Sequence, residues 1–263
     1  MNKLPKILIL HHLSSSGGTL ITKLMSTSEN FLTLSELHPH FLSGGKKDGS
    51  EFRPSSPIEQ LCFRYDLMPA KLLESKFNSD IRLIADYASS QGKILLVREW
   101  THADYLSERP AKSSQVRRLI EDALGDEYSI QSIATVRDPV DSFLSGIESQ
   151  FLQNIDNSFD KYCQVVKEFI KDMHRVNASI YRYEDIVQNP DSFLGILSKQ
   201  YDICFPSDYI SRLNQLNFSG DSGRKTEAIA FRPRRSSDLK RIARMQNEAY
   251  YQEIASQLGY LNP

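Results

Sequence analysis

The sequence has 263 residues, of which 40% are hydrophobic and 25% are charged. This composition is typical of a globular domain and excludes a collagen-like or intrinsically disordered chain. The 32 Lys and Arg residues nearly balance 33 Asp and Glu residues, so no overall positive field favours nucleic acid or an anionic membrane. We expect one domain over residues 1–263, in which any site for a polyanion is local.

The cysteines and the start of the chain bear on the compartment. Cys62, Cys163 and Cys204 lie far apart and follow neither CxxC nor Cys/His spacing, which argues against a disulfide framework and a zinc site. The apolar run at 7–10 is too short for the core of a signal peptide or for a membrane span. The sequence therefore predicts a cytoplasmic protein without a membrane span.

Short apolar runs without polar alternation predict strands at residues 7–10, 31–34, 93–97, 130–136 and 179–183. Helical spacing predicts helices from about Leu20, Phe159 and Phe193, and a C-terminal helix over about 237–258. Strands and helices in this order indicate an α/β fold in three layers, with a central, mostly parallel sheet of about five strands. Ligands of such folds bind at the carboxyl ends of the strands, beside a reversal of strand order. The polar stretch at 43–57 is expected as a loop or lid.

A turn of small residues follows the first strand and leads into a helix. It consists of Ser14, Ser15, Ser16, Gly17, Gly18 and Thr19. Glycines let a backbone approach a phosphate closely, and the first N–H groups of a helix favour an anion. The turn is not a Walker motif, because Thr19 stands where that motif requires a lysine. An ordinary strand-to-helix turn with a serine cap is the alternative.

Arg137 follows the fourth strand, and Ser145 lies eight residues later. Asp138 can cap the helix between them, with Pro139 at its first position. The apolar stripe of this helix predicts that Ser145 lies off the core-facing side. An Arg fork and a rotating hydroxyl could both reach one phosphate monoester. The alternative is an arginine on a solvated rim and an incidental exposed serine.

Two later segments complete the candidate set. Tyr183, at the end of the fifth strand, could stack on a nucleotide base or pack at the strand end. Between Arg224 and Arg244, eight basic residues face two acidic ones, and Arg224 and Lys225 open this run within a basic loop at 219–235. Such a local excess favours an anionic ligand, although charge runs are often solvated arms.

In this order, and over nearly the whole chain, the four features resemble the sulfotransferase family that uses 3′-phosphoadenosine 5′-phosphosulfate. The resemblance implies a P-loop-like α/β fold in which residues 14–19 hold the 5′-phosphosulfate of the donor. It also implies that Arg137, Ser145 and the loop around Arg224 and Lys225 hold the 3′-phosphate, with Tyr183 near the adenine. Members commonly carry Lys or Arg at the position of Ser15, and Lys23 or Lys225 could take that part.

Sulfuryl transfer needs a base that takes the proton of the attacking hydroxyl. His102, past the third strand, matches where cytosolic members place their catalytic histidine, and a neutral imidazole suits the task. Glu36, past the second strand, resembles the catalytic glutamate of carbohydrate-modifying members. We favour His102 and keep Glu36 as the alternative. His11 and His12 have no assigned role, and His38 and His40 lack a third ligand, so no metal site is expected.

These features predict a sulfotransferase that acts on a hydroxyl, less readily an amine, of a small-molecule, lipid or carbohydrate acceptor. Nucleic acid is not expected as a partner. A P-loop ATP-dependent kinase is a second reading, which the missing lysine after Gly18 and the lack of an evident acidic Mg²⁺ site disfavour. A non-catalytic phosphoadenosine- or polyanion-binding module is a third, suggested by Ser15.

Overall fold

The computed structural model describes residues 4–40, 69–106, 113–148, 152, 158–218, 229–230, 234 and 238–261. The expected loop at 43–57 lies outside the described residues. The same holds for Arg224, Lys225 and most of the basic loop at 219–235.

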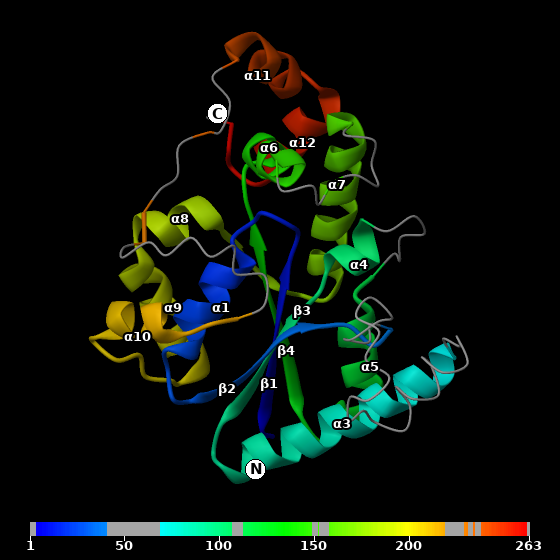
Figure 1. The fold of residues 1–263 in the computed structure, drawn as a ribbon, viewed down its shortest axis with the longest axis vertical. Helices are drawn as coiled ribbons and strands as arrows, with labels where there is room; N and C mark the ends of the chain where they lie inside the picture. Colours follow the sequence, from blue (N-terminus) through cyan, green and yellow to red (C-terminus); the bar gives the residue numbers. More distant parts are fainter. Residues whose placement is uncertain are drawn as a thin grey trace, which may run out of the picture.

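A five-stranded parallel sheet forms the centre of the described chain (Figure 1). Its strands, in chain order, are β1 (Lys6–His12), β2 (Phe31–Leu37), β3 (Ile94–Glu99), β4 (Ser129–Val136) and β5 (Ser179–Arg182). In space their order is β2-β3-β1-β4-β5, and all neighbouring pairs are parallel. The five predicted strands and the parallel sheet are therefore confirmed, although β5 ends one residue before Tyr183.

Helices cover both faces of the sheet (Figure 1). They are α1 (Gly18–Ser26), α3 (Ala70–Ser90), α4 (His102–Tyr105), α5 (Gln115–Leu124), α6 (Pro139–Glu148), α7 (Phe159–Arg175), α8 (Tyr183–Gln188), α9 (Pro190–Tyr201), α10 (Tyr209–Gln215), α11 (Leu239–Gln246) and α12 (Ala249–Gln257). Alternate residues of a strand point to opposite faces, and the core divides accordingly. Leu8 and Leu10 pack with α1 and α9, whereas Ile7 and Ile9 pack with α3 and α5. The three-layer α/β architecture expected from the sequence is therefore correct.

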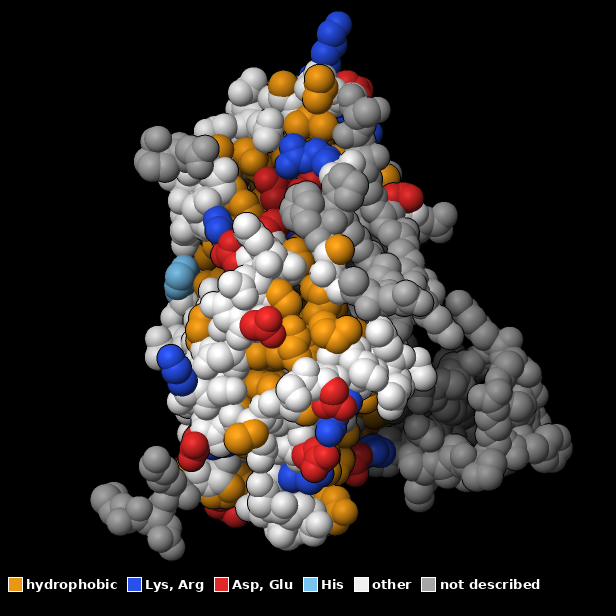
Figure 2. Space-filling model, turned by 90° about the vertical axis from the view of Figure 1, so that its left-hand side faces the viewer, with side chains coloured by type: hydrophobic (Ala, Val, Ile, Leu, Met, Phe, Trp, Pro, Cys, Tyr) orange, Lys and Arg blue, Asp and Glu red, His pale blue; other side chains and the backbone are white. Residues whose placement is uncertain are grey.

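The helical layer with α1, α8, α9 and α10 lies on the left in Figure 1, and Figure 2 looks onto it. Hydrophobic side chains gather near the middle of this face in Figure 2. The other side of the sheet is covered by α3 and α5 at one end and by α6, α7 and α12 at the other. None of the helices in the described ranges is long and apolar enough to cross a membrane.

The strand order creates one place where neighbouring connections leave in opposite directions. β1 and β4 are adjacent and pair from Lys6 to His12. The chain then passes from β1 to α1 on one face, but from β4 to α6 and α7 on the other. In open parallel sheets, ligands bind at the carboxyl ends of the strands beside such a divergence. The turn after β1 and Arg137 after β4 both lie there.

The single C-terminal helix expected over 237–258 is wrong, because the chain forms α11 and α12 there. Helix α11 closes at Asn247, whose N–H donates to the carbonyls of Ala243 and Arg244. Glu248 then adopts an extended conformation with ψ 135°. The bend lets α12 pack Tyr251, Ile254 and Ala255 into the core that it shares with α7. Helical periodicity continues through such a break, so the pattern alone did not reveal it.

Candidate active site

The turn between β1 and α1 is held by its own backbone. Ser15 and Gly17 adopt left-handed conformations with φ of 65° and 89°. Leu13 O accepts hydrogen bonds from Ser16 Oγ at 2.8 Å and Ser16 N at 3.3 Å. The residue before α1 is Gly17, so no side chain caps the helix. The serine cap of the alternative reading is therefore absent, and the N-terminus of α1, where helix N–H groups and the helix dipole favour an anion, lies at the turn.

Two aromatic rings explain both glycines of the turn. A Cβ atom at Gly17 would lie within 3.0 Å of the Tyr183 ring, and one at Gly18 would lie as close to the His12 ring. Real Cβ atoms essentially never come that near to other atoms, so a larger residue would displace the rings. Tyr183 begins α8 and His12 ends β1. The glycines thus let the turn lie flat against residues from two other parts of the sheet edge.

Arg137 joins the same group from the end of β4. Its Nη1 donates to Ser15 O at 3.2 Å, and its guanidinium carbon lies 5.0 Å from the centroid of the Tyr183 ring. The Arg137 Nε and the Ser14 Oγ are buried and have no hydrogen-bond partner among the described residues. Buried polar atoms are normally satisfied, so these two are candidates to bind a polar ligand. The structure therefore brings together the turn, Arg137 and Tyr183.

Ser145 departs from the expectation. It lies in α6, which is buried along its length from Pro139 to Gly146, and Ser145 itself is 8% exposed. The apolar stripe predicted that Ser145 lies off the core-facing side, but all residues of α6 from Pro139 to Gly146 are buried. Asp138 does cap this helix, because its Oδ1 accepts the N–H of Val140 at 2.8 Å.

Arg234, the one basic residue that the structure describes in the loop at 219–235, is paired within the chain. Its side chain lies 2.5 Å from Asp141 and 3.4 Å from Asp138. This part of the local positive charge is therefore balanced by carboxylates at the start of α6. The ion pairs attach residue 234 beside the first turn of α6.

The second candidate base, Glu36, lies in an irregular part of β2. The pairing of β2 with β3 shifts between Ser35 and Leu37, so Glu36 is an extra, bulged residue with φ 58°. Its Oε1 accepts a hydrogen bond from Arg98 Nη2 at 3.2 Å. Bulges beside sites re-aim a side chain, and here the bulge aims Glu36 at the end of β3.

Arg98 is the central charge of this half of the site and is only 3% exposed. Besides Glu36, it donates from Nη1 to Ser35 Oγ at 3.1 Å and from Nε to His12 Nε2 at 2.9 Å. These bonds join the carboxyl ends of β1, β2 and β3. Arg98 therefore links the candidate base Glu36 to the histidine behind the glycine turn.

His102, the favoured base, begins α4 directly after β3. Its ring lies 4.6 Å from that of Trp100 in an edge-to-face arrangement. Burial, and after it the nearby Arg98 and His38, lowers the pKa of His102 to about 4. The imidazole is therefore neutral at pH 7 and able to accept a proton. His38 is itself fixed, since its Nε2 lies 3.3 Å from Asp104 Oδ1 and its Nδ1 accepts the His40 N–H.

The polar groups thus collect along one edge of the sheet, where all five strands end. No protein-family model and no curated protein matches the sequence. Two solved structures match it over its whole length. The "Sulfotransferase Domain from the Curacin Biosynthetic Pathway" is 16% identical, with a TM-score of 0.57 and 100% of both chains covered. The "Sulfotransferase Domain from the Synechococcus PCC 7002 Olefin Synthase" is 14% identical, with a TM-score of 0.56, covering 100% of this chain and 98% of the other. The chain has the fold of these sulfotransferase domains.

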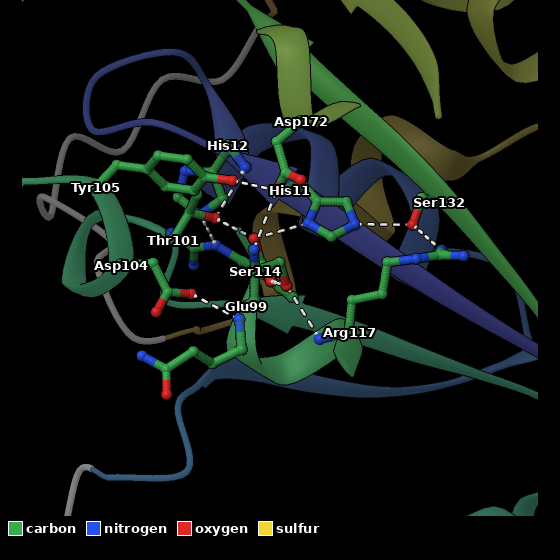
Figure 3. A network of polar contacts seen from close by, with 12 residues as sticks. His11, His12, Glu99, Thr101, Asp104, Tyr105, Ser114, Arg117, Ser132 and Asp172 are labelled. Atoms are coloured by element: carbon green, nitrogen blue, oxygen red, sulfur yellow. Dashed lines mark hydrogen bonds and ion pairs between the residues drawn. The ribbon is translucent and has the colours of Figure 1, made fainter. Parts of the chain in front are cut away.

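Behind the edge of this sulfotransferase fold lies a buried polar network (Figure 3). Glu99 accepts hydrogen bonds from His11 Nδ1 at 2.6 Å, from Thr101 Oγ1 at 2.9 Å and from Ser114 Oγ. Thr101 Oγ1 in turn accepts the backbone N–H of His12 at 3.1 Å. The network therefore anchors the residue before His102. It also places His11 on the opposite face from His12, as alternation along a strand requires.

The sequence analysis assigned no role to three residues that organise this edge of the sheet, Arg98, Glu99 and Thr101. The sequence signal that could have revealed them is the charged pair Arg98 and Glu99 at the end of an apolar strand, because charges in a strand covered on both faces need partners.

Lys23, one suggested substitute for the cation missing at Ser15, lies in the last turn of α1, away from the glycine turn. Among the described residues, no group of three or more His, Cys, Asp and Glu side chains could hold a metal ion.

Proposed function

We propose that this chain is a sulfotransferase that moves a sulfuryl group from 3′-phosphoadenosine 5′-phosphosulfate to the hydroxyl of an acceptor. One observation carries the proposal. The glycine turn, Arg137 and Tyr183 meet at the carboxyl ends of β1 and β4, where the buried Ser14 Oγ and Arg137 Nε have no partner among the described residues. The fold of known sulfotransferase domains supports the same function.

The residues present fit a donor with two separate anionic groups. The N-terminus of α1, which no side chain of the preceding residue caps, and residues 14–19 suit the 5′-phosphosulfate, because backbone N–H groups and the helix dipole at a helix N-terminus favour an anion. We assign Arg137, Ser145, Arg224 and Lys225 to the 3′-phosphate and the Tyr183 ring to the neighbourhood of the adenine. The donor supplies the activated sulfuryl group, and the protein supplies position and charge.

In the proposed reaction, an S–O bond to the acceptor forms as the S–O bond to the donor phosphate breaks. The acceptor proton passes to a base of the protein. We propose His102 for this role because of its position: it begins α4 directly after β3, at the edge of the sheet that carries the glycine turn. Glu36 is the alternative, but its carboxylate already accepts a hydrogen bond from buried Arg98. Departure of the phosphate is aided by the N–H groups at the start of α1.

Calorimetric titration with 3′,5′-phosphoadenosine tests the donor site, with 5′-AMP and ATP plus Mg²⁺ as comparisons. We expect binding of the bisphosphate, weakened about 10- to 150-fold in Arg137→Ala, as for the loss of a charge-assisted hydrogen bond. The affinity for 5′-AMP should change little. Arg182→Ala is the matched control, because Arg182 ends the neighbouring strand but pairs with Asp185 and Gly259 O.

Equal losses for both nucleotides in Arg137→Ala would remove Arg137 from the 3′-phosphate site. No binding of the bisphosphate, or a preference for ATP with Mg²⁺, would contradict the sulfotransferase proposal and favour the kinase reading. A second candidate function is a non-catalytic phosphoadenosine-binding module, which the position of Lys23 at the far end of α1 favours. It predicts tight binding of the bisphosphate with no transfer from radiolabelled donor to any of a panel of hydroxyl acceptors.

A further inference from the structure

Three hydrogen bonds from one buried guanidinium connect the carboxyl ends of three strands. Arg98 on β3 donates to His12 on β1 and to Ser35 and Glu36 on β2. Its side chain and that of His12 point to the face of the sheet that α1 covers, since both alternate in step with Leu96 and Leu10. The bonded groups include both a candidate base and the ring that packs under Gly18.

We propose that Arg98 is a positioning residue of the site, which locks the His12 ring in one tautomer beneath the glycine turn and keeps Glu36 as its counter-ion. Glu36 is then held away from service as the base. The importance of this arrangement for sulfuryl transfer rests on the proposed function, but the arrangement itself can be tested without any substrate.

The tautomer follows from the chemistry of the donors. A guanidinium has N–H donors and no acceptor, so His12 Nε2 must accept the bond from Arg98 Nε and carries no proton. The single proton of the neutral ring lies on Nδ1, from which it donates to Leu13 O at 3.1 Å. A second proton, on Nε2, would face the guanidinium across 2.9 Å. The ring is therefore held neutral, in the Nδ1–H form.

This tautomer supports the turn directly. Leu13 O, which accepts from His12 Nδ1, also accepts from the backbone N–H and the hydroxyl of Ser16. The carbonyl therefore holds both sides of the turn, one of them through the His12 ring that fills the space left by Gly18. If the His12 ring flips or takes the other tautomer, Leu13 O loses one of its donors, and the turn loses a contact beneath the first N–H groups of α1.

Glu36 fits the role of counter-ion. It is bulged and left-handed, a strained conformation for a residue with a side chain, and its carboxylate lies on Arg98. Protonation of that carboxylate would leave the charge of a 3% exposed arginine without this partner. The other titratable groups near this cluster are His11 and His102, which act electrostatically on His12, and His38, which acts on His102. The pKa of His12 is lowered mainly by burial and then by Arg98.

The first test is a long-range ¹H–¹⁵N NMR spectrum of the wild-type chain labelled with ¹⁵N-histidine, with His12 assigned by His12→Gln. We expect His12 to be neutral and in the Nδ1–H form at pH 7, although free histidine favours Nε2–H. A protonated ring or the Nε2–H form would overturn the proposal. This measurement needs no variant of Arg98.

Arg98→Met then removes the donor. We expect His12 to populate the Nε2–H form and to titrate at a higher pH than in the wild type. Arg82→Met is the control, because Arg82 on α3 bonds Glu127 and Ala123 O on a remote helix pair. An unchanged His12 spectrum in a folded Arg98→Met chain would contradict the tautomer lock.

The counter-ion role is tested by urea denaturation of Glu36→Gln, Arg98→Met and the double variant. We expect Glu36→Gln to lower the urea midpoint clearly in the wild-type background and much less in the Arg98→Met background, because only the first leaves a buried charge without its carboxylate. Glu29→Gln, at an exposed pair with Arg212, should change the midpoint little. Additive effects would overturn the counter-ion role. Failure of 3′,5′-phosphoadenosine to bind the wild type would instead contradict the proposed function and leave these results intact.

Discussion

At the residue scale, Gly17 shows how closely the turn and Tyr183 fit. Gly17 and Gly92 both have positive φ, 89° and 66°, but a Cβ would strike the Tyr183 ring at Gly17 and meet nothing within 4 Å at Gly92. An alanine at either position would be strained by the positive φ, but only at Gly17 would its Cβ also clash with a neighbouring side chain. Comparison of the same substitution at both isolates the contribution of the contact with Tyr183.

We predict that Gly17→Ala lowers the free energy of unfolding by about 2–4 kcal/mol, against about 1 kcal/mol for Gly92→Ala, where only strain is added. Gly17→Ala should also weaken 3′,5′-phosphoadenosine by at least about tenfold, because the displaced Tyr183 ring carries Arg137 with it. Urea denaturation and calorimetry measure the two effects. Equal destabilisation at Gly17 and Gly92 would show that the ring moves aside at little cost.

At the element scale, α7 is joined to α4 and α5 by one carboxylate. Asp172 accepts hydrogen bonds from Tyr105 OH on α4 and from the backbone N–H of Ser114, which caps α5, at 3.0 Å. It also pairs with Arg175 on its own helix. Since α4 has only four residues, its position depends on such contacts rather than on its internal hydrogen bonds.

We predict that Asp172→Asn lowers the free energy of unfolding by about 2–3 kcal/mol. The amide lacks the negative charge that strengthens the bonds from Tyr105 and Ser114, and its NH2 group would face Arg175 in place of Oδ1. The predicted loss corresponds to a fall in Tm of about 4–12 °C for a domain of this size. Glu168→Gln, at an exposed pair on the same helix, should leave Tm within about 1 °C. A similar small change in Asp172→Asn would show that α4 is held by apolar packing alone.

The elements also show which features of the structure could be predicted from the sequence. Each strand was predictable because strands covered on both faces are continuous apolar runs, and Gly17, Arg137 and Tyr183 were predictable as a group because carboxyl ends of parallel strands meet. The partners of Arg98 were not predictable from the sequence. His12 and Glu36 lie beside Arg98 because β1 and β2 flank β3 in the sheet, and no sequence pattern marks the bulge at Glu36. The burial of Ser145 and the break at Asn247 depend on helices packed from distant parts of the chain.

At the scale of the whole molecule, buried histidines make stability depend on pH. The pKa of His102 is lowered to about 4 and that of His12 well below 6.5, both mainly by burial. In the unfolded chain these rings take up protons near pH 6.5, so the unfolded state binds more protons than the folded state below that pH. Their effect is absent above about pH 7.5, and stability falls as the pH drops from about 6.5 towards about 4.

We predict that the free energy of unfolding falls by up to about 1.4 kcal/mol per pH unit for each of these two groups between about pH 6 and about pH 4.5. His102→Gln should reduce this slope, whereas His174→Gln, at an exposed histidine of α7, should not. Urea denaturation at a series of pH values gives the slopes. If the slope is the same in His102→Gln as in the wild type, the pKa of His102 is not lowered.

The central place of β1 has a consequence for the order in which the molecule is made. On the ribosome, β1 emerges more than one hundred residues before β4, the strand that pairs with it over its whole length. At about 5–20 residues per second, the apolar run from Ile7 to Leu10 spends about 6–25 s without one of its two neighbouring strands. The glycine turn is thus translated well before Arg137 and Tyr183, so a chain truncated before residue 137 carries the turn without the two side chains that lie against it.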